Sequence, residues 1–182
     1  MSTPGASKDA VILGSAVEGL FARALKPTGA FADELRALGV DLQRLEPTYP
    51  LPVWYAAVRV ALRHVAGHLP EEAGFRLLGE RFIAGFFDTL VGKMVAVGLP
   101  LLGPDKTVQR LARTWTTAQP SLRMETQKEA EARWRLTLHQ QGVLPHFCAG
   151  IIHAGLQRTG VTPDIQVLEH GPAHCVLQVR WS

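Results

Sequence analysis

The sequence has little cysteine and no long apolar run, and each absence excludes a class of protein. Only two cysteines occur, Cys148 and Cys175, so a small fold held together by disulfides is excluded and reduced thiols are expected. Charged residues interrupt every apolar stretch before it reaches the ~20 residues that a membrane-spanning helix needs. Residues 1–10 lack the pattern of a signal peptide. We therefore expect a soluble, cytoplasmic protein with no membrane insertion.

Blocks of like charge are also missing, which leaves little support for a nucleic-acid partner. The chain carries 19 Lys and Arg against 16 Asp and Glu, a formal net charge of +3, and the signs alternate. One face of an expected sheet forms a local cationic surface from Arg123, Arg133, Arg135, Gln178 and Arg180. Because this face has no aromatic residues for base stacking, we expect a solvated face or an acidic partner and no nucleic acid.

The sequence lacks the phosphate-binding and nucleophile motifs of common enzymes. It has no Gly-x-x-x-x-Gly-Lys-Ser/Thr loop, no Gly-x-Gly-x-x-Gly turn and no Gly-x-Ser-x-Gly elbow. Cys148 lies near the start of an expected helix, close to His146, so an enzyme of unrecognised type using Cys148 is an alternative. Nothing supplies an orienting third group or an oxyanion hole. We expect a protein that is not an enzyme.

Two groupings of histidine and cysteine are candidate metal sites, and both are disfavoured. His64 and His68 have the i, i+4 spacing with which two imidazoles can share an ion, but they are expected on the polar flank of a helix. The second grouping consists of His146, Cys148, His174 and Cys175. Adjacent strand residues such as His174 and Cys175 point to opposite faces, so both cannot reach one ion. No metal and no cofactor is expected.

Apolar periodicity predicts helices in the first half of the chain. A helix from Ser15 ends before Pro27, and a short one over residues 30–38 closes at Gly39. Residues 49–52, Tyr-Pro-Leu-Pro, are expected to be an extended connector. The helical spacing then covers residues 54–65, continues from Pro70 towards Leu99, and restarts at residues 103–105.

From about Thr116 the apolar period changes from 3.6 to 2, which predicts strands. A hairpin is expected with its turn at residues 128–131, then a helix over 146–158, then a second hairpin turning at residues 170–172. The prediction is a single α+β domain, 1–182, with residues 1–10 flexible, a helical half over 11–115 and a β-β-α-β-β antiparallel sheet packed on helices over 116–182.

The second half also predicts which side chains face the covering helix, residues 147–156. The sheet side is expected to present Trp134, Leu136, Leu138, Leu177, Val179 and Trp181. Gly150 and Ala154 are expected at the closest approach of the helix to the sheet.

Glycines in an apolar helix predict a ligand pocket. Gly79, Gly85 and Gly92 each cost about 1 kcal/mol of helix stability relative to alanine, so another factor must favour them. One explanation is that they leave room beside aromatic walls. The ligand-binding residues are then expected to be Phe75, Phe82, Phe86, Leu90, Trp134 and Phe147. The alternative is that the glycines only let neighbouring helices or a second subunit approach closely.

Several motifs taken together resemble a known family. They are Gly14-Ser15-Ala16-Val17-Glu18-Gly19-Leu20-Phe21, Tyr49-Pro50-x-x-Val53-Trp54, Gly79-x-x-Phe82-x-x-Gly85-Phe86, Leu144-Pro145-x-Phe147-x-Ala149-Gly150 and Val179-Arg180-Trp181. They are similar to an uncharacterised family, domain of unknown function 2378, that occurs in many copies in myxobacteria. The resemblance covers nearly the whole chain and implies a source and a fold more than an activity.

The second half is also similar to the ligand-binding fold of vinyl-reductase-like domains, haem-based nitric-oxide sensors and Golgi transport-particle subunits. That resemblance implies a ligand between helices and sheet, and dimerisation in several relatives. The Tyr-x-Ser-x-Arg motif of the haem sensors has no counterpart after Tyr49 or Tyr55, so haem is not implied. The expected function is a ligand-binding, signalling or adaptor domain that binds an apolar small molecule or a protein partner. A self-association module without a ligand, with a homodimer as its product, is the alternative.

Overall fold

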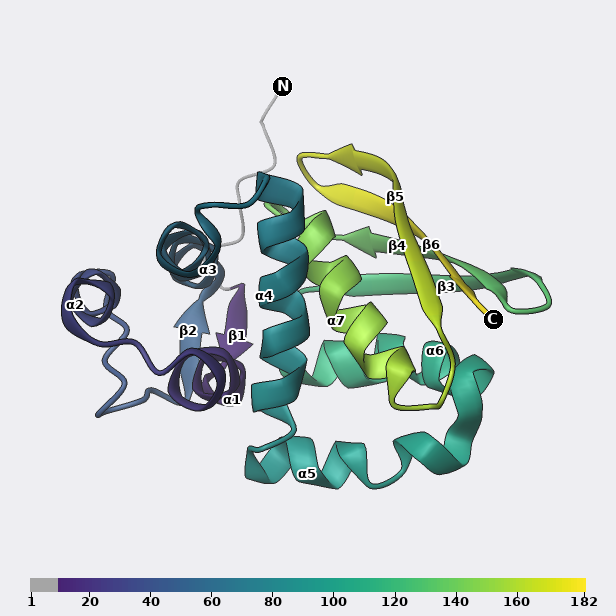
Figure 1. Ribbon diagram of the computed structural model, residues 1–182, viewed down its shortest axis with the longest axis horizontal. Helices are drawn as coiled ribbons and strands as arrows, with labels where there is room; N and C mark the ends of the chain where they lie inside the picture. Colours follow the sequence, from purple (N-terminus) through teal and green to yellow (C-terminus); the bar gives the residue numbers. More distant parts are fainter. Residues whose placement is uncertain (1–9) are drawn as a thin grey trace.

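The computed structural model describes residues 10–182, and its order of elements is helices first and a sheet last (Figure 1). The expected flexible segment, residues 1–10, lies outside these residues except for Ala10. The first half contains β1 (Val11–Leu13), α1 (Gly14–Val17), the π-helix η1 (Glu18–Leu25), α2 (Gly29–Ala37), β2 (Thr48–Pro50), α3 (Leu51–Ala66), α4 (Glu71–Phe86), α5 (Leu90–Ala96) and α6 (Leu99–Ala118). The second contains β3 (Arg123–Ala130), β4 (Arg133–His139), α7 (Pro145–Gln157), β5 (Pro163–Gly171) and β6 (His174–Trp181). The predicted α+β class is confirmed.

Several helix ends lie where the sequence predicts them. Gly39 adopts a φ of +88°, and the backbone N–H of Val40 donates to the Leu35 carbonyl at 2.9 Å, which closes α2 with a left-handed cap. The expected connector over residues 49–52 is wrong in its second half. Leu51 and Pro52 already belong to the first turn of α3. The fixed φ of proline suits this turn, and its missing N–H does no harm there because the first backbone N–H groups of a helix have no carbonyl partner within the helix.

The expected long helix from Pro70 towards Leu99 is interrupted, and this part of the prediction is wrong. The helix α4 ends at Phe86, and α5 begins three residues after Phe87. Thr89 causes the restart: its hydroxyl donates to the Phe86 carbonyl at 2.7 Å and accepts from the Gly92 N–H at 3.0 Å. A buried threonine that caps both ends favours two helices over one continuous helix. The predicted restart at residues 103–105 coincides with a kink in α6, where Gly103 has a φ of +72°.

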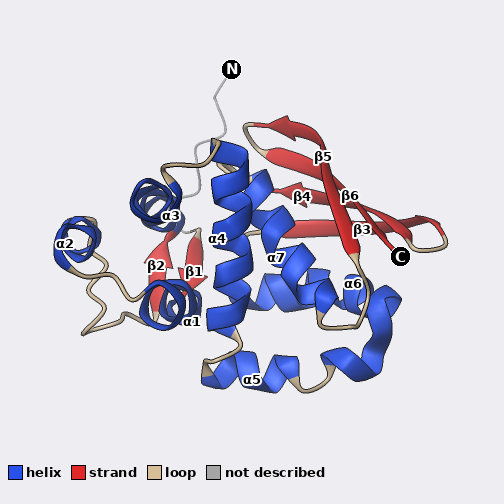
Figure 2. Ribbon diagram, in the orientation of Figure 1, coloured by secondary structure: helices blue, strands red, loops and turns tan. Residues whose placement is uncertain are grey.

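The sheet is antiparallel with strand order β3-β4-β6-β5, and helices cover one of its faces (Figure 2). Its centre is the β4–β6 pair, in which Leu136 lies opposite Leu177. The first hairpin turns at Glu131 and Ala132, later than expected, because β3 continues through an irregularity between Lys128 and Ala130. No helix within residues 10–182 combines the length and apolarity that a membrane crossing demands.

The inner face of the sheet carries the predicted apolar residues. Trp134, Leu136, Leu138, Leu177 and Val179 are buried, and Trp181 packs against them while partly exposed. On α7, the residues in the same cluster are Cys148, Ala149, Ile152 and Leu156. The core of the second half is therefore formed mainly by α7 side chains on strands β4 and β6, with Val108 of α6, Met124 of β3 and Ile165 of β5 in the same cluster.

The expected place of Gly150 is wrong, because this glycine faces another helix and not the sheet. A Cβ on Gly150 would lie 2.1 Å from the Arg76 carbonyl oxygen of α4, and one on Gly79 would lie 2.1 Å from the Phe147 carbonyl oxygen of α7. Ala154 likewise packs with the cluster of the first half. The two helices lie side by side in Figure 1, and this contact joins the helical half to the sheet half.

The outer face of the sheet is of mixed charge, which corrects the expected cationic surface. Arg123 pairs with Glu125 at 2.8 Å and Arg180 with Asp164 at 2.5 Å. Glu129 accepts from Arg135 at 2.7 Å and lies 3.8 Å from Arg133. Hydrogen bonding from Arg135 lowers the pKa of Glu129. The arginines of this face are thus matched by carboxylates, which removes the electrostatic reason for an anionic partner.

Candidate functional site

A cavity of about 100 Å³ lies where the helical half meets the sheet half. Its walls come from β1, α1, α3, α4, α6 and α7 and from the segments that flank β3 and β4. The lining residues are Ile12, Ala16, Trp54, Tyr55, Phe82, Ile83, Phe86, Leu111, Thr114, Trp115, Gln119, Leu122, Gln140, Val143, Leu144, Phe147, Cys148 and Ile151. Since both halves contribute, a molecule in the cavity would touch both.

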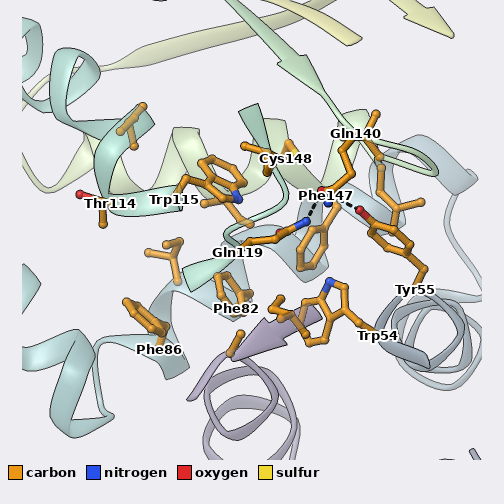
Figure 3. A pocket seen from close by; sticks show the side chains of 18 residues that line it. Trp54, Tyr55, Phe82, Phe86, Thr114, Trp115, Gln119, Gln140, Phe147 and Cys148 are labelled. Atoms are coloured by element: carbon orange, nitrogen blue, oxygen red, sulfur yellow. Dashed lines mark hydrogen bonds between the residues drawn. The ribbon is translucent and has the colours of Figure 1, made fainter. Parts of the chain in front are cut away.

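Aromatic side chains from three helices form one wall of the cavity (Figure 3). Trp54 of α3 makes edge contacts with Phe82 and Phe147, with ring centroids 6.0 Å apart in both pairs. Phe82 stacks on Phe86 one turn further along α4 at 5.7 Å. These interlocked rings hold each other in place, so the wall is formed before any ligand arrives.

Two glutamines and a tyrosine form a polar corner in this otherwise apolar cavity. The side-chain oxygen of Gln140 accepts hydrogen bonds from the Gln119 amide and from the Tyr55 hydroxyl, the latter at 3.1 Å. The Gln140 amide nitrogen donates to the Ser121 hydroxyl at 2.8 Å. In Figure 3 the Gln119 side chain points across the cavity toward Gln140 and Tyr55. We call these three residues, Tyr55, Gln119 and Gln140, the amide corner.

The ionisable groups at the cavity stay protonated. Burial raises the pKa of the Tyr55 phenol and raises the pKa of the Cys148 thiol well above its usual range. Burial also raises the pKa of Cys175, on the strand behind Cys148, to about 12. Both cysteines are free and buried. The site is therefore neutral at physiological pH, and its hydrogen bonds are those of uncharged groups.

The six residues predicted to bind a ligand fall into two groups of three. Phe82, Phe86 and Phe147 line the cavity. The other three lie elsewhere. Phe75 is buried, with the Arg59 guanidinium carbon 5.7 Å from the centroid of its ring. The Trp134 indole N–H donates to an Asp105 carboxylate oxygen at 2.8 Å. Leu90 is 81% exposed on α5.

Sequence reasoning missed the other half of the site. The helical spacing over residues 54–65 gives Trp54 no role in binding, and no pattern singles out Trp115 or the amide corner, although all of them line the cavity. An apolar stripe on an amphipathic helix does not tell which of its members faces a cavity. The sequence shows that Gln119 and Gln140 flank the first hairpin, but only the structure shows that both are buried.

The residues of the two disfavoured metal groupings lie apart in the structure. His64 pairs with Glu34 at 2.8 Å and stacks on the Phe31 ring at 4.8 Å. His146 lies 3.5 Å from Glu72, and His174 lies 2.8 Å from Glu169. Within residues 10–182, no three histidine, cysteine or acidic residues come close enough to hold a metal ion. His64, His146 and His174 instead each lie beside a separate carboxylate.

Comparison with known proteins finds a family and a fold. The family described as Protein of unknown function (DUF2378) matches residues 10–182. No curated protein matches the chain.

Solved H-NOX structures resemble this chain over nearly its whole length. An H-NOX protein from S. oneidensis in the Fe(II)NO state has a TM-score of 0.71 at 15% identity, covering 94% of this chain and 99% of that chain. The unliganded Fe(II) H-NOX protein from K. algicida gives 0.67 at 9% identity, covering 94% and 97%. A structure concerned with haem redox potential and porphyrin distortion gives 0.58 at 14% identity, covering 93% and 92%. At these identities the likeness shows the fold alone.

Proposed function

The chain belongs to the family of proteins of unknown function DUF2378 and shares the H-NOX fold, and from that premise we propose that it is a non-enzymatic ligand-binding domain in signalling. Its ligand is a small apolar molecule held in the cavity between the two halves. The observation that carries the proposal is the cavity itself, with its preformed aromatic wall. A ligand there contacts α3 and α4 on one side and α6 and α7 on the other, so its binding is coupled to the relative position of the halves.

Haem, which one of the similar structures concerns, does not fit the residues of this cavity. All seven histidines lie within residues 10–182, and none of them lines the cavity. Two lining side chains could ligate iron, Tyr55 and Cys148, and burial holds the pKa of each above its usual value, which opposes the phenolate or thiolate that would bind. No lysine or arginine of the described residues lines the cavity to pair with the propionates. The volume is also far below the about 300–1,000 Å³ of pockets for larger ligands.

The chemistry of the lining residues supports a domain without catalysis. A thiol attacks as its thiolate, and burial disfavours the thiolate of Cys148. His146, the nearest histidine in sequence, faces Glu72 at the surface of α7 and does not line the cavity. The alternative of an enzyme based on Cys148 therefore finds no activating base beside its nucleophile among the described residues that line the cavity.

Filling the cavity is expected to stabilise the protein and to abolish ligand binding. Leu111 of α6 lines the cavity and is only partly buried, so a larger ring can enter there without displacing the core. In the wild type, toluene at tenfold excess over its dissociation constant should raise Tm by about 3–6 °C. In Leu111→Trp, the ligand-free Tm should rise, since filling a cavity contributes about 0.5–2 kcal/mol. Toluene should then have no effect, as measured by scanning calorimetry.

The matched control is Leu168→Trp. Leu168 is 45% exposed on β5, away from the cavity, so this variant should keep the wild-type response to toluene. A wild-type protein whose Tm is unchanged by toluene, or an equal response in Leu111→Trp, would contradict the proposed site.

A second candidate function is self-association, and an exposed apolar stripe favours it. Leu90, Met94, Val97 and Leu101 are 81%, 77%, 78% and 89% exposed. Their spacing of four, three and four residues is that of a coiled-coil seam, and the backbone at Val97 and Gly98 stays near helical values between α5 and α6. Because the spacing reads the same in reverse, a second copy running antiparallel would present matching side chains.

The stripe predicts a dimer that a single charge abolishes. Sedimentation velocity at tens of micromolar should show dimeric wild-type protein and monomeric Met94→Lys. Leu168→Lys, a charge at another exposed leucine, should remain dimeric. A monomeric wild type would rule out this second function and leave the ligand-binding proposal untouched.

A further inference from the structure

We infer that α6 is the gate of the cavity: residues 104–118 swing away from the sheet to admit a ligand, and a latch centred on Asp105 holds them closed. This inference rests on the proposed function, because it concerns how the same cavity is entered. Three observations on the described residues carry it: the exposure of the α6 side of the cavity, the shallow packing of α6 and the hydrogen bonds of Asp105.

The cavity meets solvent on the side of α6. Of the described residues that line it, Thr114 is the only exposed one, and Leu111 and Trp115 on the same helix are partly exposed. The lining residues of α4 and α7 are all buried. In Figure 3 the Trp115 side chain points from α6 toward the cavity. An outward movement of α6 therefore widens the entrance and leaves the aromatic wall of α3, α4 and α7 in place.

Few buried side chains hold α6 to the rest of the protein. Over residues 101–116, where its side chains are described, only Thr107 and Val108 are buried. Val108 packs in the sheet-side core, but the Thr107 hydroxyl donates within α6 itself, to the Gly103 carbonyl at 2.8 Å. Most residues of α7, in contrast, are buried. Because a segment with few buried apolar side chains opens at a lower free energy than the core, α6 should move before α4 and α7 separate.

The two ends of residues 104–118 differ in their freedom to move. At Gly103, with φ +72° and ψ 170°, the chain leaves helical geometry. Glycine populates positive and negative φ about equally, so this position can act as a hinge. At the other end, Gln119 is buried and its side chain is bonded to Gln140 in the amide corner. The end next to Gly103 is therefore the end that swings.

Asp105 ties this movable end to the sheet. Its carboxylate accepts the indole N–H of Trp134 on β4 at 2.8 Å and lies 3.0 Å from the ammonium of Lys128 on β3. Burial alone would raise the pKa of Asp105, but the hydrogen bonds from Lys128 and Trp134 together outweigh it and lower the pKa. The ionised carboxylate is thus the form that both donors hold. We call Asp105, Lys128 and Trp134 the latch.

The two buried thiols measure the opening of the gate within one protein. Cys148 lines the cavity, whereas Cys175 is buried on β6 and is not among the lining residues. Burial raises the pKa of both thiols, so each reacts when it becomes uncovered. Methyl methanethiosulfonate is a small, uncharged reagent: the thiolate attacks its sulfenyl sulfur, a disulfide forms and methanesulfinate leaves. In native wild-type protein, Cys148 should be labelled at least about 10-fold faster than Cys175, as measured by peptide mass spectrometry.

Removal of the latch should accelerate labelling at Cys148 and leave labelling at Cys175 unchanged. In Asp105→Ala and in Lys128→Ala, the Cys148 rate should rise about 3- to 10-fold, the factor that one net hydrogen bond provides. The matched control is Asp164→Ala. Asp164 pairs with Arg180 at the opposite edge of the sheet, so its removal should leave both rates at their wild-type values.

Each outcome decides for or against the gate. Equal rates at the two cysteines of the wild type would show that the cavity is reached through unfolding, which overturns the gate. Fast labelling of Cys148 that neither latch variant changes would place the entrance elsewhere and overturn it as well, as would an equal acceleration in Asp164→Ala. Labelling uses no ligand, so a latch-dependent rate supports the gate even if toluene does not bind and the proposed function fails. If Asp105→Ala does not fold, Lys128→Ala and the wild-type ratio decide.

Discussion

Gly79→Ala is expected to destabilise the protein by about 3 kcal/mol, near the upper end for overpacking of a core. The Cβ of alanine would lie 2.1 Å from the Phe147 carbonyl oxygen and 2.9 Å from the Ile151 backbone nitrogen of α7. Both are backbone atoms inside a helix, so neither can rotate away as a side-chain end would. Relief requires the helices α4 and α7 to separate, which breaks the main contact between the two halves. The free energy of unfolding from urea denaturation measures the loss.

The reciprocal variant should behave in the same way, and a glycine on the same helix provides the control. Gly150→Ala places its Cβ 2.1 Å from the Arg76 carbonyl oxygen of α4, and a similar loss is expected. Gly155, five residues further along α7, has nothing within 4 Å of its added Cβ. Gly155→Ala should therefore stabilise the protein by about 0.5–1 kcal/mol, because alanine loses less backbone entropy in a helix. Losses of similar size in all three variants would show that close approach is not the cause.

Trp54→Ala is expected to cost about 3–5 kcal/mol, and indole should restore part of the loss. Trp54 is 3% exposed and contacts the rings of Phe21, Phe82 and Phe147 with its edges or faces. Its removal enlarges the existing cavity by the volume of the indole, and the aromatic neighbours prevent this added space from collapsing. Free indole then binds to the folded state alone and stabilises it by mass action. Thermal unfolding with and without indole measures both effects.

Two controls separate rescue at this position from a general effect of indole. Trp54→Phe keeps one ring against Phe82 and Phe147, so it should lose less stability and respond less to indole. Trp115→Ala removes another tryptophan from the cavity wall, but Trp115 is only partly buried on α6, so a smaller loss is expected. Indole that raises Tm equally in the wild type and in Trp54→Ala would contradict a specific rescue.

The sequence by itself determined the elements whose cause is local. The left-handed cap at Gly39, the kink at Gly103 and the alternation of apolar residues along β4 and β6 each depend on neighbours within a few residues. The class, helices followed by a β-β-α-β-β sheet, follows from the change of period near Thr116. The family resemblance likewise rests on short motifs that are visible without a structure.

Only the tertiary structure decided which residues meet across elements. Gly150 could have faced the sheet or another helix, and its contact with the Arg76 carbonyl depends on how α4 crosses α7. Thr89 ends α4 because its hydroxyl reaches the Phe86 carbonyl while being buried, which residue type alone did not predict. The glycines of α4 proved compatible with both explanations: Gly79 and Gly85 touch helix backbone, and a cavity lies beside Phe82 and Phe86.

The amide corner shows the physical reason for this division. Tyr55, Gln119 and Gln140 are separated by 64 and 21 residues along the chain, and they meet because α3, the end of α6 and the end of β4 converge at one place. Periodicity reports which face of one helix or strand is buried. It carries no information on which buried faces meet, since that depends on the packing of whole elements. The α+β class was therefore readable from local patterns, whereas the cavity exists only in the assembled fold.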